Sequence, residues 1–584
     1  MTITFRVGLG RAVAAALLAV AALPTAAVAF PSAPAPTTPT DPSPDHRRLV
    51  WKTCARGPDD DTGKALDRAG AQCADLKVPL DYATPAGRTI GIAVARLRAA
   101  DPAHRIGTLL YNMGGPADPA IESLPAVSAA MGETARRYDI VGVDPRFTGR
   151  NTPLDCGWRT ETYFRSTGPD RAGFDRMRAF ERGLAEQCRD RAGALLPYVS
   201  TRNAARDMDA VRAALGERRI SFYGVSYGTY LGEVYTAMFP GRTDRVVLDG
   251  VHDPSRLAPW AEYGTEQVNE DALRHWAGWA AAHDRTYGLG GTADAVLATL
   301  DGIQSAAVGR PLAIGPYRVD RHVAPLFDYA VLGDDTEEGD ALVAGVFRTL
   351  KRAADTGHAE PDAFLTAFLA ATLTGDGSAY GSTQTAYLCA DTPGPRDTEV
   401  HWRAIERTRA RHPLFGPFLN NVTPCSFWPR PKERPVTTVH NDIPALMVNA
   451  TGDPRVPYSE ARQMHARWPA SRLVTVTGSY RHGVYGTDYG DTCVNDTVNA
   501  YLATGRLPAA DLTCAPVRPP RTAVATHPDL VAARVYYLPH VFSPIERQPA
   551  HLVNLRQTDS NKGSHPHPWS VPGQAVHNGL LSHE

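Results

Sequence analysis

The sequence predicts an α/β fold in which a mostly parallel central sheet is interrupted by a long helical insertion. Short apolar segments alternate with amphipathic helical patterns over much of the chain, as in folds built from strand–helix–strand units. Several of these segments are apolar along nearly their whole length, which is typical of strands covered on both faces of a parallel sheet. From about residue 255 to 435 helical patterns dominate, which predicts a cap domain lying over the sheet.

Individual elements follow from apolar periodicity and from the residues that bound each segment. The helix predicted at residues 201–215 has Thr201 as a possible cap, and Gly216 suits its end. Seven segments are predicted strands, at residues 89–97, 107–111, 138–144, 220–225, 246–248, 444–450 and 472–476. The insertion shows no clear buried strand, and its predicted helices span residues 260–282, 341–354, 361–372 and 401–411.

The first 29 residues have the three parts of an export signal peptide. Arg6 and Arg11 precede an apolar run at residues 12–23, and the small-residue stretch Ala27-Val28-Ala29 follows. A membrane anchor needs ~20 apolar residues, so this run is too short for one. We therefore expect cleavage after Ala29, secretion to the extracellular space and no stable membrane insertion afterwards.

Composition divides the remaining chain into folded parts and two polar ends. Residues 30–46 are rich in Pro, Ser and Thr and are predicted to be a linker or pro-segment. Residues 521–584 are rich in His and Pro, lack periodicity and are predicted to be a disordered tail. Residues 47–254 and 436–520 are expected to form the core around the sheet, with 255–435 as the cap.

Charge and cysteine content exclude some classes of partner and cofactor. The formal net charge is −1, so the chain has no basic surface to attract nucleic acid. An even number of cysteines in an exported chain favours disulfides, and their order along the chain makes sequential pairing the simplest. None has C-x-x-C spacing or neighbours a His pair, so no metal site is expected. The expected pairs are Cys54–Cys73, Cys156–Cys188, Cys389–Cys425 and Cys493–Cys514.

The strongest catalytic pattern is the pentapeptide Gly224-Val225-Ser226-Tyr227-Gly228. It follows the apolar segment 220–225 and opens a helical stretch, which is the context in which G-x-S-x-G presents a nucleophilic serine. Glycines flank the serine because side chains there would collide as the backbone reverses. The N-terminus of the following helix favours the negative charge of an oxyanion. The pattern predicts an α/β-hydrolase fold, with Ser226 as the nucleophile.

A serine nucleophile needs a base that is itself oriented by a carboxylate, and in this fold the acid and the histidine follow the serine in that order. Asp453 comes just after the predicted strand 444–450, at the strand end where ligands bind. His482 lies on the loop after the next predicted strand. His252 and His440 are the nearest rivals, but both precede Asp453. Asp453 and His482 are therefore the predicted partners of Ser226.

The glycine-rich segment after the early strand 107–111 is the expected second part of an oxyanion hole. It reads Tyr111-Asn112-Met113-Gly114-Gly115-Pro116. In this fold one backbone donor comes from such a loop, and the other comes from the residue after the nucleophile. We assign these donors to the N–H groups of Gly115 and Tyr227.

Together, these motifs resemble the secreted bacterial tripeptidyl aminopeptidase family of α/β-hydrolases, which is related to proline iminopeptidase. The resemblance covers about residues 51–514. It rests on the Ser226, Asp453 and His482 segments and on residues 73–82 (CADLKVPLDY), 114–116 (GGP), 144–146 (DPR), 201–207 (TRNAARD), 248–251 (LDGV), 425–429 (CSFWP) and 501–508 (YLATGRLP). The resemblance implies cleavage of short peptides from a free N-terminus, a peptide substrate and no cofactor.

The chain departs from the family pattern close to the expected site. Ala117 and Asp118 follow Pro116 where relatives usually have a glycine, and Phe147 replaces the glycine of D-P-R-G. Val456 stands where a threonine is common. None of these changes removes a predicted triad residue. Two alternatives stay open: a secreted carboxylesterase acting on small acyl esters, and an inactive homologue that only binds.

An exopeptidase must recognise the substrate's terminal ammonium, which calls for carboxylates above the nucleophile. The cap supplies seven acidic candidates: Glu262, Glu266, Glu270, Asp334, Asp335, Glu337 and Glu338. The spacing of the first three would place them on one face of a helix. That arrangement is also typical of a solvated helix face, and the later four are typical of a charged loop. The sequence therefore predicts the requirement for a free amine but selects no single anchor.

Overall fold

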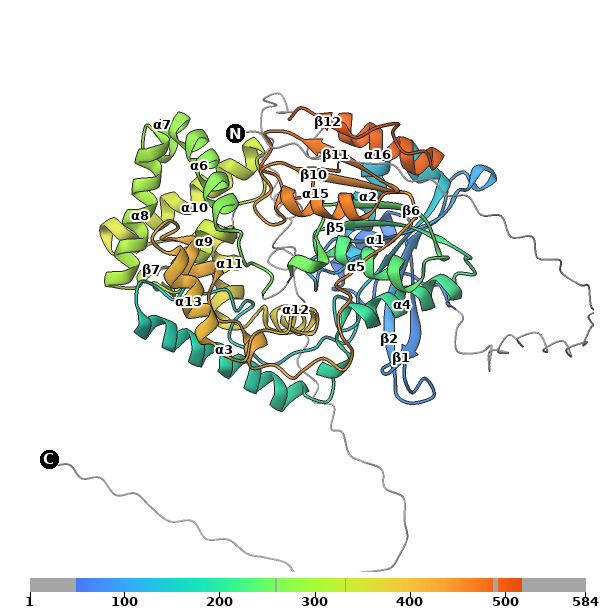
Figure 1. Ribbon diagram of the computed structural model, residues 1–584, viewed down its shortest axis with the longest axis horizontal. Helices are drawn as coiled ribbons and strands as arrows, with labels where there is room; N and C mark the ends of the chain where they lie inside the picture. Colours follow the sequence, from blue (N-terminus) through green and yellow to red (C-terminus); the bar gives the residue numbers. More distant parts are fainter. Residues whose placement is uncertain (1–48, 258–259, 331, 487–491, 517–584) are drawn as a thin grey trace, which may run out of the picture. The chain divides into compact units, whose positions relative to one another are not determined.

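The computed structural model describes residues 49–257, 260–330, 332–486 and 492–516 (Figure 1). The predicted signal peptide, the linker or pro-segment and the C-terminal tail lie outside these residues. No helix in the described ranges is long and apolar enough to cross a membrane.

A nine-stranded sheet forms the core, in the order β1-β2-β4-β3-β5-β6-β10-β11-β12 (Figure 1). Pairing is antiparallel between β1 and β2 and between β2 and β4, and it is parallel at every other junction. The strands are β1 Gln72–Pro79, β2 Thr89–Leu97, β3 Gly107–Asn112, β4 Tyr138–Val143, β5 Ile220–Val225, β6 Thr243–Asp249, β10 Ala445–Ala450, β11 Ser471–Val476 and β12 Leu512–Cys514. All seven predicted strands are present, and the mostly parallel sheet confirms the expected fold class.

Helices cover both faces of this sheet because alternate residues of each strand point to opposite faces. On one face Phe222 of β5 packs in a cluster with residues of α4 Thr201–Ala214, α5 Tyr227–Met238 and α15 Tyr458–Arg467. On the other, Tyr223 packs in a cluster with residues of α1 Asp61–Arg68, α2 Leu124–Met131 and α16 Thr492–Thr504. Burial on two faces explains why the strand segments are so uniformly apolar.

Helix α4 begins at Thr201, as predicted, but the residue that caps it is Ser200 and not Thr201. Ser200, with an extended backbone, accepts a hydrogen bond from the N–H of Asn203 and caps the helix. Thr201 is instead the first helical residue, and its hydroxyl donates to Asp391 Oδ2 at 2.6 Å. Gly216 follows the helix with a φ of +76°, as its predicted role at the end requires.

The helical part after β6 has a hydrophobic core of its own, which includes Trp276, Phe347 and Leu369. Its longer helices are α6 Glu266–Ala282, α8 Ala293–Gly309, α10 Glu337–Thr356, α11 Ala363–Thr374, α12 Ser378–Asp391 and α13 Glu399–Thr408. It also contains a small sheet of β7 Leu312–Ile314, β8 Tyr317–Val319 and β9 His358–Ala359. The absence of a clear strand signal there was therefore misleading, because these strands are only two or three residues long.

A second segment, between β4 and α4, joins this helical part. It includes α3 Arg171–Ala192, which lies beside the insertion's helices in Figure 1. Phe174 of α3 packs against Ile405 and Val422 of the insertion. The N–H of Trp158 donates to Ser378 Oγ at 2.7 Å. The segment was expected in the core, and it contacts both parts, because Trp158 and Leu184 also belong to the cluster that covers the sheet.

Four disulfides join consecutive cysteines, as the order along the chain suggested. They are Cys54–Cys73, Cys156–Cys188, Cys389–Cys425 and Cys493–Cys514. No free cysteine occurs among the described residues.

Candidate active site

Ser226 occupies the sharp turn between β5 and α5. Its φ of +55° is rarely adopted by a residue with a side chain, so the turn is strained, as expected of a nucleophile elbow. A Cβ on Gly224 would overlap the carbonyl of Gly228, and a Cβ on Gly228 would overlap the carbonyl of Asn112. Both flanking glycines are therefore required by close backbone contacts.

Asp453 and His482 meet at the carboxyl ends of two neighbouring strands. Asp453 follows β10, and His482 lies on the loop after β11. The Nδ1 atom of His482 lies 2.9 Å from Oδ1 and 2.8 Å from Oδ2 of Asp453. Only 1% of Asp453 and 4% of His482 is exposed, so water competes little for this hydrogen bond. The backbone N–H groups of Arg455 and Val456 also donate to Asp453 Oδ1, at 2.8 and 3.0 Å.

Backbone packing places this pair at the same sheet edge as Ser226. Gly250, which follows β6, has a φ of +69°, and a Cβ there would lie 3.1 Å from His482 Cε1 and 3.5 Å from Asp453 Oδ2. A Cβ on Gly483 would lie 3.2 Å from a methyl carbon of Val225, the residue before the nucleophile. The loop that carries His482 is thus packed against the elbow.

The two rival histidines occupy other surroundings. His440 is exposed, on the segment before β10. His252 lines the cavity next to Ser226, but its Nδ1 lies 3.4 Å from Glu460 Oε2. Of the three histidines considered, His482 is the one whose ring is held by Asp453.

The Gly114-Gly115 loop lies directly beside the elbow. Gly114 and Gly115 have φ values of +113° and +102°, and a Cβ on Gly114 would lie 3.0 Å from the Cβ of Ser226. Gly115, Ser226 and Tyr227 line one cavity. The structure thus brings the predicted oxyanion-hole residues to the nucleophile.

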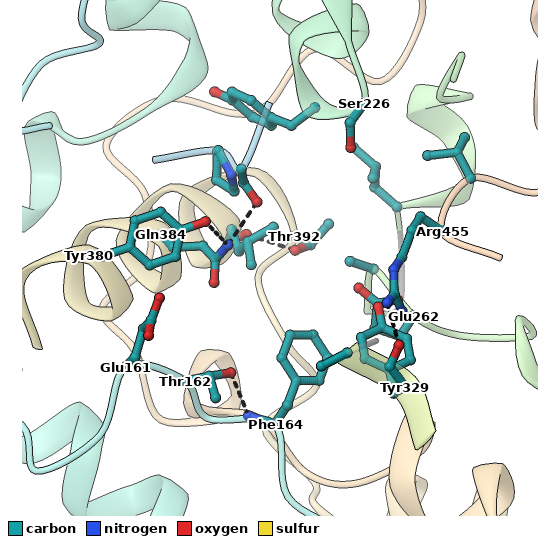
Figure 2. A pocket seen from close by; sticks show the side chains of 18 of the residues that line it. Glu161, Thr162, Phe164, Ser226, Glu262, Tyr329, Tyr380, Gln384, Thr392 and Arg455 are labelled. Carbon is teal, nitrogen blue, oxygen red and sulfur yellow. Dashed lines mark hydrogen bonds between the residues drawn. The ribbon is translucent and has the colours of Figure 1, made fainter. Parts of the chain in front are cut away.

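This cavity of about 150 Å³ lies where the core meets the helical part of the chain. Figure 2 shows Ser226 above the cavity, with Glu262, Tyr329 and Arg455 grouped on one wall. Glu161, Tyr380 and Gln384 lie on the opposite wall. Apolar side chains complete the lining, among them Phe164, Leu326 and Phe368. A small cavity that is lined by a serine and a few polar groups suits a short, charged substrate.

Glu262 is the acidic group on the first wall. Its Oε2 accepts a hydrogen bond from the Tyr329 hydroxyl at 3.0 Å. Burial raises the pKa of the carboxyl, while the Tyr329 hydrogen bond and the nearby Arg455 charge oppose that rise. A carboxylate in this state gains from the arrival of a further cation.

Comparison with known proteins identifies the family. A model described as alpha/beta hydrolase fold matches residues 108–281, and one described as TAP-like protein matches residues 412–514. The tripeptidyl aminopeptidase of Streptomyces lividans is 36% identical over 472 residues, which cover 77% of this chain and 84% of that protein. The chain belongs to the tripeptidyl aminopeptidase family. As the elbow motif predicted, it is a serine hydrolase with the α/β-hydrolase fold.

The chain is also similar to two proteins that are not named tripeptidyl aminopeptidases. Serine protease Hip1 of Mycobacterium tuberculosis is 27% identical over 465 residues, covering 76% of this chain and 87% of that protein. Carboxylesterase B of the same organism is 30% identical over 496 residues, covering 76% and 86%.

Asp118, which departs from the family pattern, connects the oxyanion loop to the cap. Its Oδ1 accepts a hydrogen bond from the Tyr380 hydroxyl of α12 at 2.9 Å. Gln384, one turn further along α12, donates through Nε2 to the carbonyl of Gly115 at 2.8 Å. It also donates to the Tyr380 hydroxyl at 3.1 Å. We call Asp118, Tyr380 and Gln384 the α12 clamp, because they hold the Gly115 loop against the cap.

The other departures leave the triad geometry in place. Phe147 has a φ of +68°, a conformation that glycine adopts freely and a bulky residue adopts at a cost, yet its ring is buried in the core. Val456 is 1% exposed and keeps its N–H on Asp453.

Of the seven acidic candidates from the cap, Glu262 alone lines the cavity. The expectation of one shared helical face is wrong, because α6 begins at Glu266 and Glu262 precedes it. Glu266 accepts from Asn420 Nδ2 at 2.6 Å, and Glu270 lies 2.8 Å from His412 Nδ1. Glu337 accepts from Trp279 Nε1 at 3.0 Å.

Asp334 and Asp335 support the histidine loop instead of forming a plain charged loop. Asp335 Oδ2 accepts from Ser479 Oγ at 2.9 Å and from the N–H of Tyr480 at 2.7 Å. Asp334 pairs with Arg481 at 2.9 Å. The N–H of His482 donates to the carbonyl of the neighbouring Gly333 at 2.9 Å. No local pattern could indicate these contacts, because they join segments about 145 residues apart.

Glu161 is a cavity residue that sequence reasoning missed. It lies on the irregular segment before α3. This segment carries no motif, and it reaches the cavity because it packs against the cap.

Within the described ranges, no group of three or more His, Cys, Asp or Glu side chains is arranged to hold a metal ion.

Proposed function

We propose that the protein is a secreted serine exopeptidase that releases short peptides, such as tripeptides, from free N-termini. The observation that carries the proposal is the cavity itself, which Ser226 lines together with the half-buried side chain of Glu262. Support comes from the Asp453–His482 hydrogen bond and from the Streptomyces lividans relative, which is named a tripeptidyl aminopeptidase. Four disulfides and the predicted signal peptide support secretion.

In this proposal Ser226 Oγ attacks the scissile carbonyl carbon, and His482 Nε2 accepts the hydroxyl proton. Asp453 holds the Nδ1–H of His482 and stabilises the imidazolium. The backbone N–H groups of Gly115 and Tyr227 donate to the oxyanion of the tetrahedral intermediate. His482 then gives its proton to the leaving amine, and the C–N bond breaks to leave an acyl-enzyme. Water, deprotonated by His482, hydrolyses the ester and restores Ser226.

The substrate ammonium would bind Glu262. An ammonium carries a positive charge and three donors, which suit a carboxylate that already accepts one hydrogen bond from Tyr329. A free chain end held at a fixed place in the cavity sets the length of peptide that reaches Ser226. Blocking the amine removes both the charge and the chain-end signal.

The triad assignment is tested by substitution and labelling. Ser226→Ala and His482→Ala should each lower kcat on a peptide anilide by ~10³-fold or more, because triad members act as a unit. His440→Ala, at an exposed position, is the matched control and should keep full activity. A fluorophosphonate should label Ser226 in the wild-type protein. Ser226→Ala activity above a few per cent of wild type would contradict the assignment.

A carboxylesterase is the second candidate, favoured by the 30% identity to carboxylesterase B of Mycobacterium tuberculosis. Both reactions use the same triad and oxyanion donors, because both pass through a tetrahedral intermediate. The two are separated by comparing kcat/KM on peptide anilides with kcat/KM on small nitrophenyl esters. Turnover of the esters alone would favour the esterase, and failure of fluorophosphonate labelling would indicate an inactive homologue.

A further inference from the structure

We infer that Asp249 is a positioning residue that holds the His482 loop against the nucleophile elbow. This inference rests on the proposed triad. Asp249 ends β6, the strand between β5, which carries Ser226, and β10, which precedes Asp453. Its side chain is 1% exposed and points away from solvent into the junction of these strands.

The carboxylate of Asp249 binds the chain just after His482. Its Oδ2 atom accepts hydrogen bonds from two consecutive backbone N–H groups, those of Val484 and Tyr485, each at 2.8 Å. These residues are buried, so no water is at hand to replace the acceptor. The two bonds fix the backbone two and three residues beyond the histidine, and with it the direction of approach of the imidazole.

The backbone of the same turn contacts the other two triad segments. The carbonyl of Asp249 accepts from the N–H of Ser226 at 2.9 Å, and the N–H of Gly250 donates to the carbonyl of Val448 in β10 at 3.0 Å. Asp249 and Gly250 therefore join the elbow, the acid strand and the histidine loop through three separate hydrogen-bonded contacts.

Burying a carboxylate at this position costs free energy, because burial disfavours the charged form. Burial raises the pKa of Asp249 to about 6, the two N–H donors and His482 lower it, and Asp453 raises it. Within the described chain no donor reaches its Oδ1 atom. An aspartate occupies this position although few groups compensate its charge. We interpret it as a residue whose role is to supply an acceptor oxygen.

The test separates the acceptor from the charge and from general stability. Asp249→Asn keeps one oxygen that can accept both N–H groups, whereas Asp249→Ala leaves both without an acceptor. Asp67→Ala is the matched control, because Asp67 also accepts two consecutive backbone N–H groups, from Cys54 at 2.6 Å and Ala55 at 3.1 Å. Asp67 lies on α1, and its neighbour Leu66 belongs to the cluster on the face of the sheet opposite α5. Asp249→Ser replaces the alanine variant if that protein does not fold, since a serine hydroxyl is too short to span both donors.

The measurements are the rate of fluorophosphonate labelling per folded molecule, and kcat and KM on a peptide anilide. We expect Asp249→Ala to lower kcat and labelling rate by ~30-fold or more with KM changed by less than ~3-fold, because the base is misplaced and binding is not. Asp249→Asn should stay within ~5-fold of wild type, and Asp67→Ala should label at the wild-type rate.

Two results would overturn the inference. One is Asp249→Ala labelling as fast as wild type, which would reduce Asp249 to a stabilising residue. The other is a labelling rate of Asp249→Asn as low as that of Asp249→Ala. That result would show that labelling depends on the charge of Asp249 and not on its hydrogen bonds to the loop. A wild-type protein that is not labelled at Ser226 at all would overturn the proposed function, and the inference with it.

Discussion

Two carboxylates, those of Asp453 and Glu262, differ in the groups that donate hydrogen bonds to them. Asp453 accepts hydrogen bonds from two backbone N–H groups and contacts His482 Nδ1 through both oxygens, so each of its oxygens has a partner. Glu262 receives one hydroxyl donor and faces the cavity, so it retains capacity for a further donor. In the proposed mechanism the two carboxylates therefore serve different purposes, since Asp453 orients the base and Glu262 binds the substrate ammonium.

Replacing Glu262 should affect only substrates with a free amine. Glu262→Gln keeps the shape and the Tyr329 contact but removes the charge, so kcat/KM on a free peptide anilide should fall by ~10- to 100-fold. The N-acetylated anilide should be unaffected. Glu270→Gln, at a half-buried position of α6 that contacts His412 and does not line the cavity, is the control and should match wild type on both. Equal losses on both substrates would show that Glu262 supports the fold and not the amine.

Sequence patterns could indicate the triad because each member follows a strand in a fixed order. Ser226 lies in a motif, while Asp453 and His482 follow two successive apolar strands. The acidic lining could not be predicted in the same way. Glu161 lies in an irregular segment, and Glu262 lies just before a helix whose start was placed too early. Which acid faces the cavity depends on packing between segments that no local pattern records.

At the scale of elements, α12 is the part of the cap most directly coupled to the chemistry. The α12 clamp binds the loop that carries Gly115, so the cap directly contacts the proposed oxyanion site. Its sequence (SAYGSTQTAYLCAD) contains two Ser, two Thr and one Gly, which are poor helix formers, and no helix was predicted there. The helix forms because tertiary packing buries most of it.

The strands β1 and β12 were not predicted for local reasons: β1 carries charged residues at its exposed positions, and β12 has only three residues.

Breaking the clamp should slow chemistry more than it weakens binding. Gln384→Ala removes the donor to the Gly115 carbonyl, so the loop should loosen and kcat should fall by ~10-fold or more, since oxyanion-hole geometry contributes to the transition state alone. Gln304→Ala removes a buried contact to Asp328 elsewhere in the cap and should leave kcat unchanged. Steady-state kinetics on one anilide separate an effect on kcat from an effect on KM. A rise in KM without loss of kcat would assign Gln384 to substrate binding.

For the whole molecule, disulfides tie together segments that frame the site. Cys493–Cys514 links α16 to β12, the strand at the edge of the sheet next to β11. The bond closes a loop of 21 residues, for which chain-entropy arguments give a stabilisation of ~3 kcal/mol. The double variant Cys493→Ala/Cys514→Ala should therefore unfold at lower denaturant concentration but keep its kcat below the transition. An unchanged midpoint would show that the covalent link adds nothing to stability.

Two matched substrates test whether the cavity requires a free N-terminus on the substrate. Two peptide anilides of identical sequence, one with a free and one with an acetylated amine, are compared by kcat/KM on the purified protein. Losing a charged, partly buried contact costs a few kcal/mol, so the free peptide should be cleaved at least ~100-fold more efficiently. Equal rates on the two peptides would contradict the exopeptidase and favour an esterase or an endopeptidase.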